Sequence, residues 1–215
     1  MAINVTADSV KRRLKFEYLK IKNEHSSKSL ELFTSLLAHF SKPDISVADL
    51  IQETTMLVQK QFRLRWCMIG LREPDGWYRY IVMTGMREDA WAKQKAKQYK
   101  LSDFDPNAAN YKAGEISKLT RVYLEEDNRL GKEDEGVVNR PALLHLSRKA
   151  EDDVLEADFI DTLIMGPGDD LLGWIEYSGT VTGKMPDAMA IRHIEVASQI
   201  ISAGILVHRN RARQA

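Results

Sequence analysis

Apolar residues recur every three or four positions over the first sixty residues, which is the spacing of amphipathic helices. The stripe of the first helix, residues 7–24, is narrow and consists of Val10, Leu14, Tyr18 and Ile21. A polar break at residues 25–27 precedes a second helix with a wider apolar face. That helix is expected to stop at residues 41–44, because they contain a proline. Ser46 and Asp49 form a capping box that predicts the start of a third helix.

The hydrophobic period changes to two after residue 61, which predicts β-strands. The first strand is expected over residues 62–69 and the second over 77–84, joined by the turn Glu73-Pro74-Asp75-Gly76. Three more strands are expected, at residues 116–124, 159–165 and 171–178. Hairpins of this kind imply an antiparallel sheet.

The remaining segments include a helix over residues 88–98, a short helix or irregular loop over 102–113, and a mobile surface loop over 128–136. A long last helix follows residues 182–187. Its heptad-like seam consists of Ile191, Ile194, Ser198, Ile201, Ile205 and His208. A second apolar side consists of Val196, Ile200, Ala203 and Val207. Helices at both ends of a hairpin-rich chain predict the α+β class.

These elements predict three parts: an N-terminal helix over residues 1–25, a domain over 26–208, and a basic tail over 209–215. The narrow stripe of the first helix requires a partner surface. Two alternatives are open: the helix packs on its own domain, or it packs on a second subunit.

Composition narrows the class of protein. The 31 Lys and Arg residues balance 31 Asp and Glu residues, which argues against a dominant role in binding nucleic acid. A single cysteine, Cys67, excludes an intrachain disulfide and a multi-cysteine metal site. No apolar run approaches the roughly 20 residues of a membrane span, and the N-terminus lacks the core of a signal peptide. We therefore expect a soluble, cytoplasmic protein that does not contact a membrane.

Three stretches of the chain together resemble a GAF domain, the small-molecule-sensing module of many signalling proteins. They are residues 66–85 (WCMIGLREPDGWYRYIVMTG), 169–178 (DDLLGWIEYS), and 182–187 (TGKMPD) with the helix that follows. The resemblance implies an antiparallel sheet of about six strands with the terminal helices on one face. It also implies a ligand pocket on the other face, roofed by residues 86–150, and a homodimer built by the N- and C-terminal helices.

The chain departs from three functional groups of that family. The Asn-Lys-Phe-Asp-Glu signature of cyclic-nucleotide binders is absent, and Cys67 lies inside an expected strand, where it is poorly placed to attach a bilin. A methionine-sulfoxide reductase of this type would need a second cysteine to regenerate the first. No catalytic set is recognisable, so we expect a non-enzyme.

The expected pocket has seven candidate ligand-binding residues: Trp66, Met68, Tyr80, Met83, Trp91, Tyr99 and Trp174. They would suit a small apolar or planar ligand, or they would simply fill the core. The histidines show no metal-ligand spacing, and His145 is the one candidate for a haem ligand. The acidic clusters 133–135 and 151–153 are interpreted as solvated charge. Asp161 and Glu176 lie in strands and face either pocket or solvent, with solvent favoured.

The first functional hypothesis is a sensory or regulatory domain that binds a small molecule and signals through the terminal helices of a homodimer. The alternative is an interaction or dimerisation module whose pocket is filled. Neither the ligand nor any cofactor is identified by the sequence.

Overall fold

The computed structural model describes residues 5–20, 27–40, 46–105 and 111–214 of the chain. Its α-helices are α1 (Ala7–Lys20), α2 (Ser27–Phe40), α3 (Val47–Gln61), α4 (Glu88–Lys95) and α5 (Ala188–Gln214). Ser46 caps α3 by accepting a hydrogen bond from the backbone N–H of Asp49 (3.1 Å), as the capping box predicts. Residues 21–24 of the expected first helix, residues 25–26 of the polar break and the helix stop at 41–44 lie outside the described residues, and so does the side chain of Tyr18.

The sheet has seven strands in the order β3-β2-β1-β7-β6-β5-β4, and every neighbouring pair is antiparallel. The strands are β1 (Cys67–Arg72), β2 (Tyr78–Thr84), β3 (Gln98–Tyr99), β4 (Ala113–Glu115), β5 (Thr120–Tyr123), β6 (Phe159–Met165) and β7 (Leu171–Tyr177). The α+β class is confirmed, with slightly more strands than the six expected. The two shortest strands, β3 and β4, lie at the two edges of the sheet.

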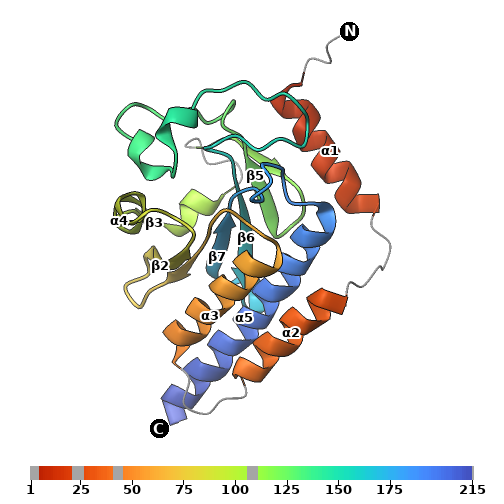
Figure 1. The fold of residues 1–215 in the computed structure, drawn as a ribbon. Helices are drawn as coiled ribbons and strands as arrows, with labels where there is room; N and C mark the ends of the chain where they lie inside the picture. The colour runs from red at the N-terminus through yellow and green to blue at the C-terminus, as the bar shows by residue number, and fades with distance from the viewer. Residues whose placement is uncertain (1–4, 21–26, 41–45, 106–110, 215) are drawn as a thin grey trace.

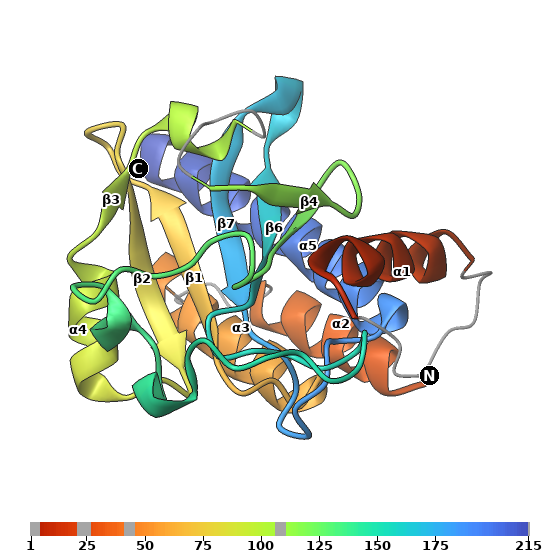
Figure 2. The same ribbon diagram turned by 90° about the horizontal axis from the view of Figure 1, so that it is seen from above.

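The two faces of the sheet are covered by different parts of the chain (Figures 1 and 2). One face packs against α3 and α5, and α2 lies across both of these helices. α1 packs on α5 and on β4 at the side of the molecule. The opposite face is covered by α4, by the short 3-10 helix η1 (Leu101–Phe104), and by residues 124–158, which we call the roof.

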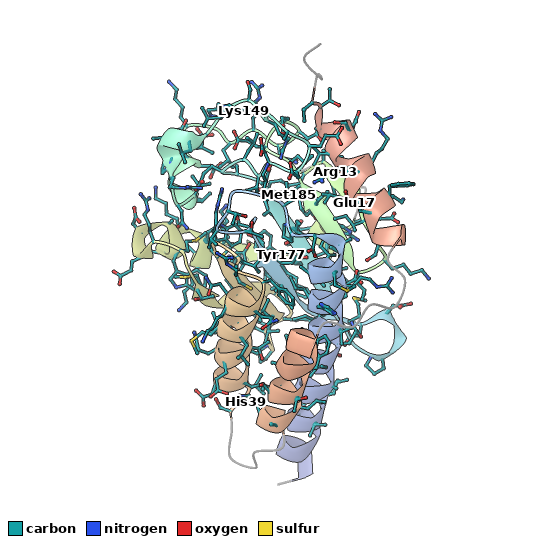
Figure 3. All side chains as sticks on the ribbon, turned by 45° about the vertical axis from the view of Figure 1, so that its right-hand side comes forward. Arg13, Glu17, His39, Lys149, Tyr177 and Met185 are labelled. Carbon is teal, nitrogen blue, oxygen red and sulfur yellow. The ribbon has the colours of Figure 1, made fainter. Side chains whose placement is uncertain are left out.

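The seam of α5 lies inside the protein. Ile191, Ile194, Ser198 and Ile201 are fully buried, and they pack in the core between the helices and the sheet together with Tyr177, labelled in Figure 3. Val196 and Val207 on the second side of α5 are 44% and 45% exposed. The helix continues to Gln214 with no break at residue 208.

α1 packs on its own domain through the described part of its stripe. Val10 and Leu14 are 0% and 1% exposed and belong to the main core cluster. Arg13 and Glu17, labelled in Figure 3, form an ion pair along the same helix (3.4 Å). The described part of this stripe thus packs on its own domain, and contact of the helix with a second subunit stays a prediction.

The first strand begins later than its alternation predicts. α3 extends to Gln61, and the next residues form a turn in which Arg63 has a φ of 51°. Leu64 makes only an isolated bridge to Thr180, so the regular strand starts at Cys67. The alternating residues 62–66 belong to a helix end and a turn because the C-terminus of α3 takes them out of the sheet.

One stretch of α5, Ala188–Arg209, is long and apolar enough to cross a membrane by length and composition alone. This differs from the expectation that no such run exists. Half of the stretch is buried inside the protein against the sheet, as in the core helix of a globular domain.

Candidate ligand-binding pocket

A cavity of about 300 Å³ lies on the face of the sheet opposite the long helices. Its floor is formed by the sheet, its sides by η1 and β3, and its cover by α4 and the roof. The residues that line it are Trp66, Tyr80, Met86, Gln94, Lys97, Gln98, Tyr99, Asp103, Phe104, Asp105, Tyr111, Ala113, Tyr123, Asn128, Leu130, Val137, Val138, Glu156, Ala157, Phe159, Asp161, Trp174 and Glu176. The volume is at the lower end of the range typical of small-molecule sites.

Two rows of residues run across the strands beneath the cavity, and four of their members, Tyr80, Trp174, Asp161 and Glu176, line it. The first row is apolar, and its paired residues are Tyr80, Gly70, Trp174 and Leu163. The second row combines sulfur and charge, and its paired residues are Met83, Met68, Glu176, Asp161 and Arg121. Because strand neighbours alternate between faces, all these positions point to the same side of the sheet.

Gly70 makes room for the indole of Trp174. A Cβ atom at this position would lie 2.1 Å from a ring carbon of Trp174, far inside van der Waals contact. The side chain of Trp174 is 1% exposed and packs against Tyr80 and Phe104, with ring centroids 4.9 and 5.1 Å away. The missing Cβ therefore allows a large aromatic group to lie flat in the floor.

Aromatic rings form two walls. On one side Tyr99 contacts Trp174 edge-on at 5.5 Å and Tyr80 at 5.9 Å. On the other side Tyr123 stacks on Phe159, with ring centroids 4.5 Å apart and planes 10° from parallel. The space between such walls suits a flat or cationic group, because ring faces carry partial negative charge.

Two carboxyl groups lie side by side in the floor. Asp161 on β6 is paired directly with Glu176 on β7, and the two residues are 8% and 6% exposed. The hydroxyl of Tyr80 donates a hydrogen bond to Oε2 of Glu176 (2.6 Å). Oδ1 of Asp161 is buried and has no hydrogen-bond partner within the described part of the chain.

Burial raises the pKa of both carboxyls, and the charge of Glu176 raises the pKa of Asp161 further. Arg121, the neighbour of Asp161 on β5, opposes the shift at Asp161. The hydrogen bond from Tyr80 and the charge of Lys97 oppose the shift at Glu176. The pair is thus set to hold a proton more tightly than exposed carboxylates do.

A network of buried ionic groups holds the roof together. Arg148, whose side chain is 1% exposed, donates two hydrogen bonds to Glu126 (2.9 and 2.8 Å) and pairs with Asp158 (2.9 Å). Burial raises the pKa of Asp158 to about 6, and the charge of Arg148 opposes that shift. Glu156, which lines the cavity, accepts hydrogen bonds from the backbone N–H and the guanidinium of Arg140.

Asp127, which we call the rim of the roof, lies next to the cavity and is bound to α1. Its carboxylate pairs with Lys11 of α1 and with Lys112 (2.9 Å). The next residue, Asn128, lines the cavity and accepts a hydrogen bond from the backbone N–H of Lys112 (2.7 Å). The N-terminal helix therefore contacts the rim of the pocket through the Lys11–Asp127 ion pair.

The structure brings four of the seven candidate residues into the cavity lining: Trp66, Tyr80, Tyr99 and Trp174. Met68, Met83 and Trp91 are not part of the lining and pack in the aromatic cluster around it. Met68 and Met83 continue the row that holds Glu176 and Asp161. The role of all seven in binding stays a prediction.

The interpretation of Asp161 and Glu176 as solvent-facing was wrong, because this face of the sheet is covered and both side chains line the cavity. One signal was available. Glu176 lies two residues after Trp174, and strand residues two apart share a face. Lys97, Phe104, Tyr111, Tyr123 and Phe159 were missed because their segments were assigned no face of the sheet.

The acidic clusters behave differently from each other. Asp152 and Asp153 both pair with Lys184 (3.1 and 2.7 Å), so residues 151–153 are not simply solvated. Glu133 and Asp134 are exposed, and the surrounding residues 128–136 form turns at the surface of the roof. No group of three or more His, Cys, Asp or Glu side chains suited to a metal ion exists in the described ranges.

His145 and Cys67 both lie outside the cavity lining. His145 is 43% exposed at its side chain and lies 3.9 Å from both Glu125 and Glu135. Cys67 is fully buried on the helix side of the sheet, and burial raises the pKa of its thiol. Neither residue is placed to hold a group bound in the cavity.

The similarity of this chain to known proteins is found by comparing structures and not by comparing sequences. No family model matches the chain, and no curated protein is significantly similar to it. Among solved structures, the phycocyanobilin-bound GAF domain of a cyanobacterial phytochrome matches with a TM-score of 0.55 and 13% identity, covering 84% of this chain and 95% of that domain.

Two further GAF domains match over similar lengths. The nlh2 GAF domain of A. aeolicus in an inactive state has a TM-score of 0.54 and 13% identity, with 84% of this chain and 97% of that one covered. The GAF domain of an Acinetobacter phosphoenolpyruvate-protein phosphotransferase has a TM-score of 0.52 and 13% identity, with coverages of 86% and 97%. The chain described above has the GAF-domain fold.

Proposed function

We propose that this chain is a non-catalytic sensory or regulatory domain that binds a small molecule in the cavity between the sheet and the roof. The observation that carries the proposal is an open, aromatic-walled cavity of about 300 Å³ with a buried, unsatisfied carboxylate oxygen in its floor. Buried polar groups without partners are costly, so they persist where a ligand completes them.

The alternative, an interaction module with a filled pocket, is less well supported. That alternative expects the aromatic residues to fill the core. They line the site, but the described side chains leave a cavity between the two walls. A filled pocket would also have little use for two adjacent carboxyls, since like charges placed opposite each other destabilise a sheet.

Two connections lead from the pocket to the terminal helices. Strand β5 presents Tyr123 to the cavity and Thr120 to the other face, where its hydroxyl donates to Glu195 of α5 (2.8 Å). The rim residue Asp127 pairs with Lys11 of α1. A ligand that favours one position of β5 or of the rim would therefore bias the position of α5 or α1.

We also propose that the domain works as a homodimer in the cytoplasm and that α5 supplies the contact. Its seam is occupied by its own domain, so the contact falls to the second side, where Val196, Ile200, Ala203 and Val207 are spaced by four, three and four residues. All four are at least partly exposed, and this spacing is the one that pairs helices in coiled coils.

The test is a thermal-shift screen of the purified protein against a library of metabolites and nucleotides. A compound that binds the native state raises the melting temperature, and the free energy of stabilisation grows as RT ln(1 + c/Kd), where c is the free ligand concentration. The matched control is Ala113→Leu, which adds carbon atoms to a lining residue on the edge strand β4. Shifts present in the wild type and absent in this variant support the proposal, and a screen with no such compound contradicts it.

A further inference from the structure

The charge of the cavity lining is strongly one-sided. Five lining residues are acidic, namely Asp103, Asp105, Glu156, Asp161 and Glu176, and one, Lys97, is basic. The charge of Glu156 is matched by Arg140 outside the lining. The acids in the floor form no ion pair within the described part of the chain, so the interior of the cavity is negative once the pair is ionised. A phosphate or carboxylate ligand would be repelled by it.

The floor has few hydrogen-bond donors for its two carboxyls. Glu176 accepts a hydrogen bond from the hydroxyl of Tyr80 on Oε2, and the indole N–H of Trp174 also helps to lower its pKa. Asp161 receives none within the described part of the chain, although it is 92% buried and lines the cavity. Arg121 is the neighbour of Asp161 along the row, but its guanidinium donates a hydrogen bond to the backbone oxygen of Phe104. The missing partner is thus a group that carries N–H or O–H donors.

The walls favour a positive charge on that group. Tyr99 and Trp174 on one side and Tyr123 on the other present aromatic rings around the acids. Aromatic rings stabilise a cation most strongly where water is excluded. The negative floor, its unsatisfied oxygen and the aromatic walls therefore all favour a positively charged ligand that donates hydrogen bonds.

We propose that the pocket binds a small organic cation with N–H donors, an ammonium, amidinium or guanidinium group, through Asp161 and Glu176, with the body of the ligand between the aromatic walls. This inference rests on the proposed function, because it names the ligand class of the same cavity. N–H groups are required because a quaternary ammonium has no hydrogen to donate to the unsatisfied oxygen of Asp161.

Binding of such a cation is coupled to protons. In the empty pocket, burial raises the pKa of both carboxyls, and a bound cation lowers it again. The other titratable groups around the pair are Arg121 and Tyr123 from β5, Tyr80 from β2, Tyr99 from β3, and Lys97 and Tyr111 in the cavity lining. Burial raises the pKa of the four tyrosines, so these stay neutral, and the carboxyl pair is the group that releases the proton.

The experiment compares three probes of one shape by isothermal titration calorimetry: benzamidine, which is a cation, benzamide, which is its neutral isostere, and benzoate, which is an anion. Benzamidine is expected to bind at least about tenfold more tightly than benzamide, since a charge-assisted pair is stronger than a neutral one. Benzoate is expected not to bind. Repeating the titration in phosphate and in HEPES buffers measures the protons released.

Three variants locate the effect. Asp161→Asn and Glu176→Gln keep the shape of the pair and remove one charge each, and both are expected to weaken benzamidine by about tenfold or more. Glu133→Gln removes a charge from the exposed surface of the roof, outside the cavity lining, and is expected to change affinity by less than about threefold. Proton release is expected to fall in Asp161→Asn and to persist in Glu133→Gln.

The outcomes separate this inference from the function it rests on. Equal binding of benzamidine and benzamide, or equal loss in Glu133→Gln and Asp161→Asn, overturns the cation site. If the library screen yields neutral or anionic compounds that Ala113→Leu blocks, the pocket is functional and the cation inference is wrong. If no compound of any charge binds the wild type, both proposals fail.

Discussion

Asp161 and Glu176 are the residues whose placement costs the fold most. They are adjacent across two central strands, both are more than nine-tenths buried, and one of them lacks a hydrogen-bond partner in the described chain. Two ionised carboxylates so close together repel each other where water cannot screen them. The folded protein is therefore more stable when the pair keeps a proton.

Asp161→Asn is expected to stabilise the protein near pH 8 by about 1–3 kcal/mol, because the amide donates to Glu176 instead of repelling it. The native pKa of Asp161 lies well above its usual value, so the folded state binds more protons than the unfolded state. The wild-type free energy of unfolding thus falls as pH rises from about 4 through the native pKa.

Urea denaturation at about pH 5 and about pH 8 measures this difference. The stability gap between variant and wild type should widen with pH, and a gap that is constant or that narrows contradicts the argument. Glu151→Gln, which removes a carboxyl from a polar turn of the roof, is the control for loss of charge alone.

Gly70→Ala is expected to destabilise the protein by about 1–3 kcal/mol and to abolish ligand binding, since the new methyl group would displace the indole of Trp174 into the cavity. Near-ultraviolet circular dichroism reports the movement of the indole, and calorimetry reports the loss of binding. Gly168→Ala, which has open space around it and a φ of 67°, separates the packing effect from backbone strain. Normal binding in Gly70→Ala would refute this role of Gly70.

Alternation along the strands correctly predicted which residues share a face of the sheet. It did not predict whether that face is covered by other segments or exposed to solvent. Trp174 and Glu176 share a face by spacing, and the aromatic residue was assigned to the pocket while the acid was assigned to solvent. Strand β7 is buried along its whole length, because helices cover one face and the roof covers the other. A single sequence does not reveal that the loop-rich roof, residues 124–158, closes over this strand.

The roof is an element with little regular structure, and ionic groups replace the ladder of hydrogen bonds that a helix or strand would supply. The acidic residues 125–127 read as the polar end of a strand, yet Glu125 is 2% exposed and accepts the backbone N–H of Ala157 (3.0 Å). Arg148 links Glu126 to Asp158 across the segment. These carboxylates are held by Arg148 or by backbone N–H groups, so loss of one member leaves buried polar groups without partners.

Arg148→Met is expected to cost about 3–5 kcal/mol, because it leaves the buried carboxylate of Asp158 unpaired. Limited proteolysis and hydrogen exchange should show the loss within residues 124–158 first. Lys184→Met removes an ion pair that is 44% exposed at the lysine and should cost less than about 1 kcal/mol. A similar small effect of both substitutions would mean that the roof does not depend on Arg148.

Among the regular elements, the sequence pattern located the hairpin strands most accurately and the edge strands of the sheet least accurately. The β6–β7 hairpin matches the expected residues within one position. Two apolar runs joined by a short Gly-Pro turn can pair in a single register, so their bounds are well defined. β4 was missed: its three residues contain Gly114 and have no alternation to detect. Edge strands of this length are defined by the partner strand and not by their own side chains.

At the scale of the whole molecule, the sheet separates two functions. The pocket lies on one face and the helices proposed to carry the signal lie on the other, so any coupling passes through strand movements or around the edge at Asp127 and Lys11. The buried seam of α5 leaves only its second side for contact with another copy of the chain.

Val196→Glu is expected to convert the proposed dimer to a monomer, because it buries a charge in the centre of an apolar helix pair. Sedimentation velocity at micromolar concentration measures the change in mass. Ala92→Glu, on the exposed side of α4, adds the same charge elsewhere and should leave the dimer intact. A wild-type protein that sediments as a monomer at this concentration contradicts the dimer.

The opposed carboxyls of the floor also have a consequence for the life of the protein in a cell. An empty pocket keeps the native state strained, and a bound cation relieves the strain and adds its own binding free energy. Ligand-free molecules would open more often and reach proteases sooner. The amount of this protein would then rise and fall with the supply of its ligand, so that turnover itself becomes a second output of sensing, independent of any helix movement.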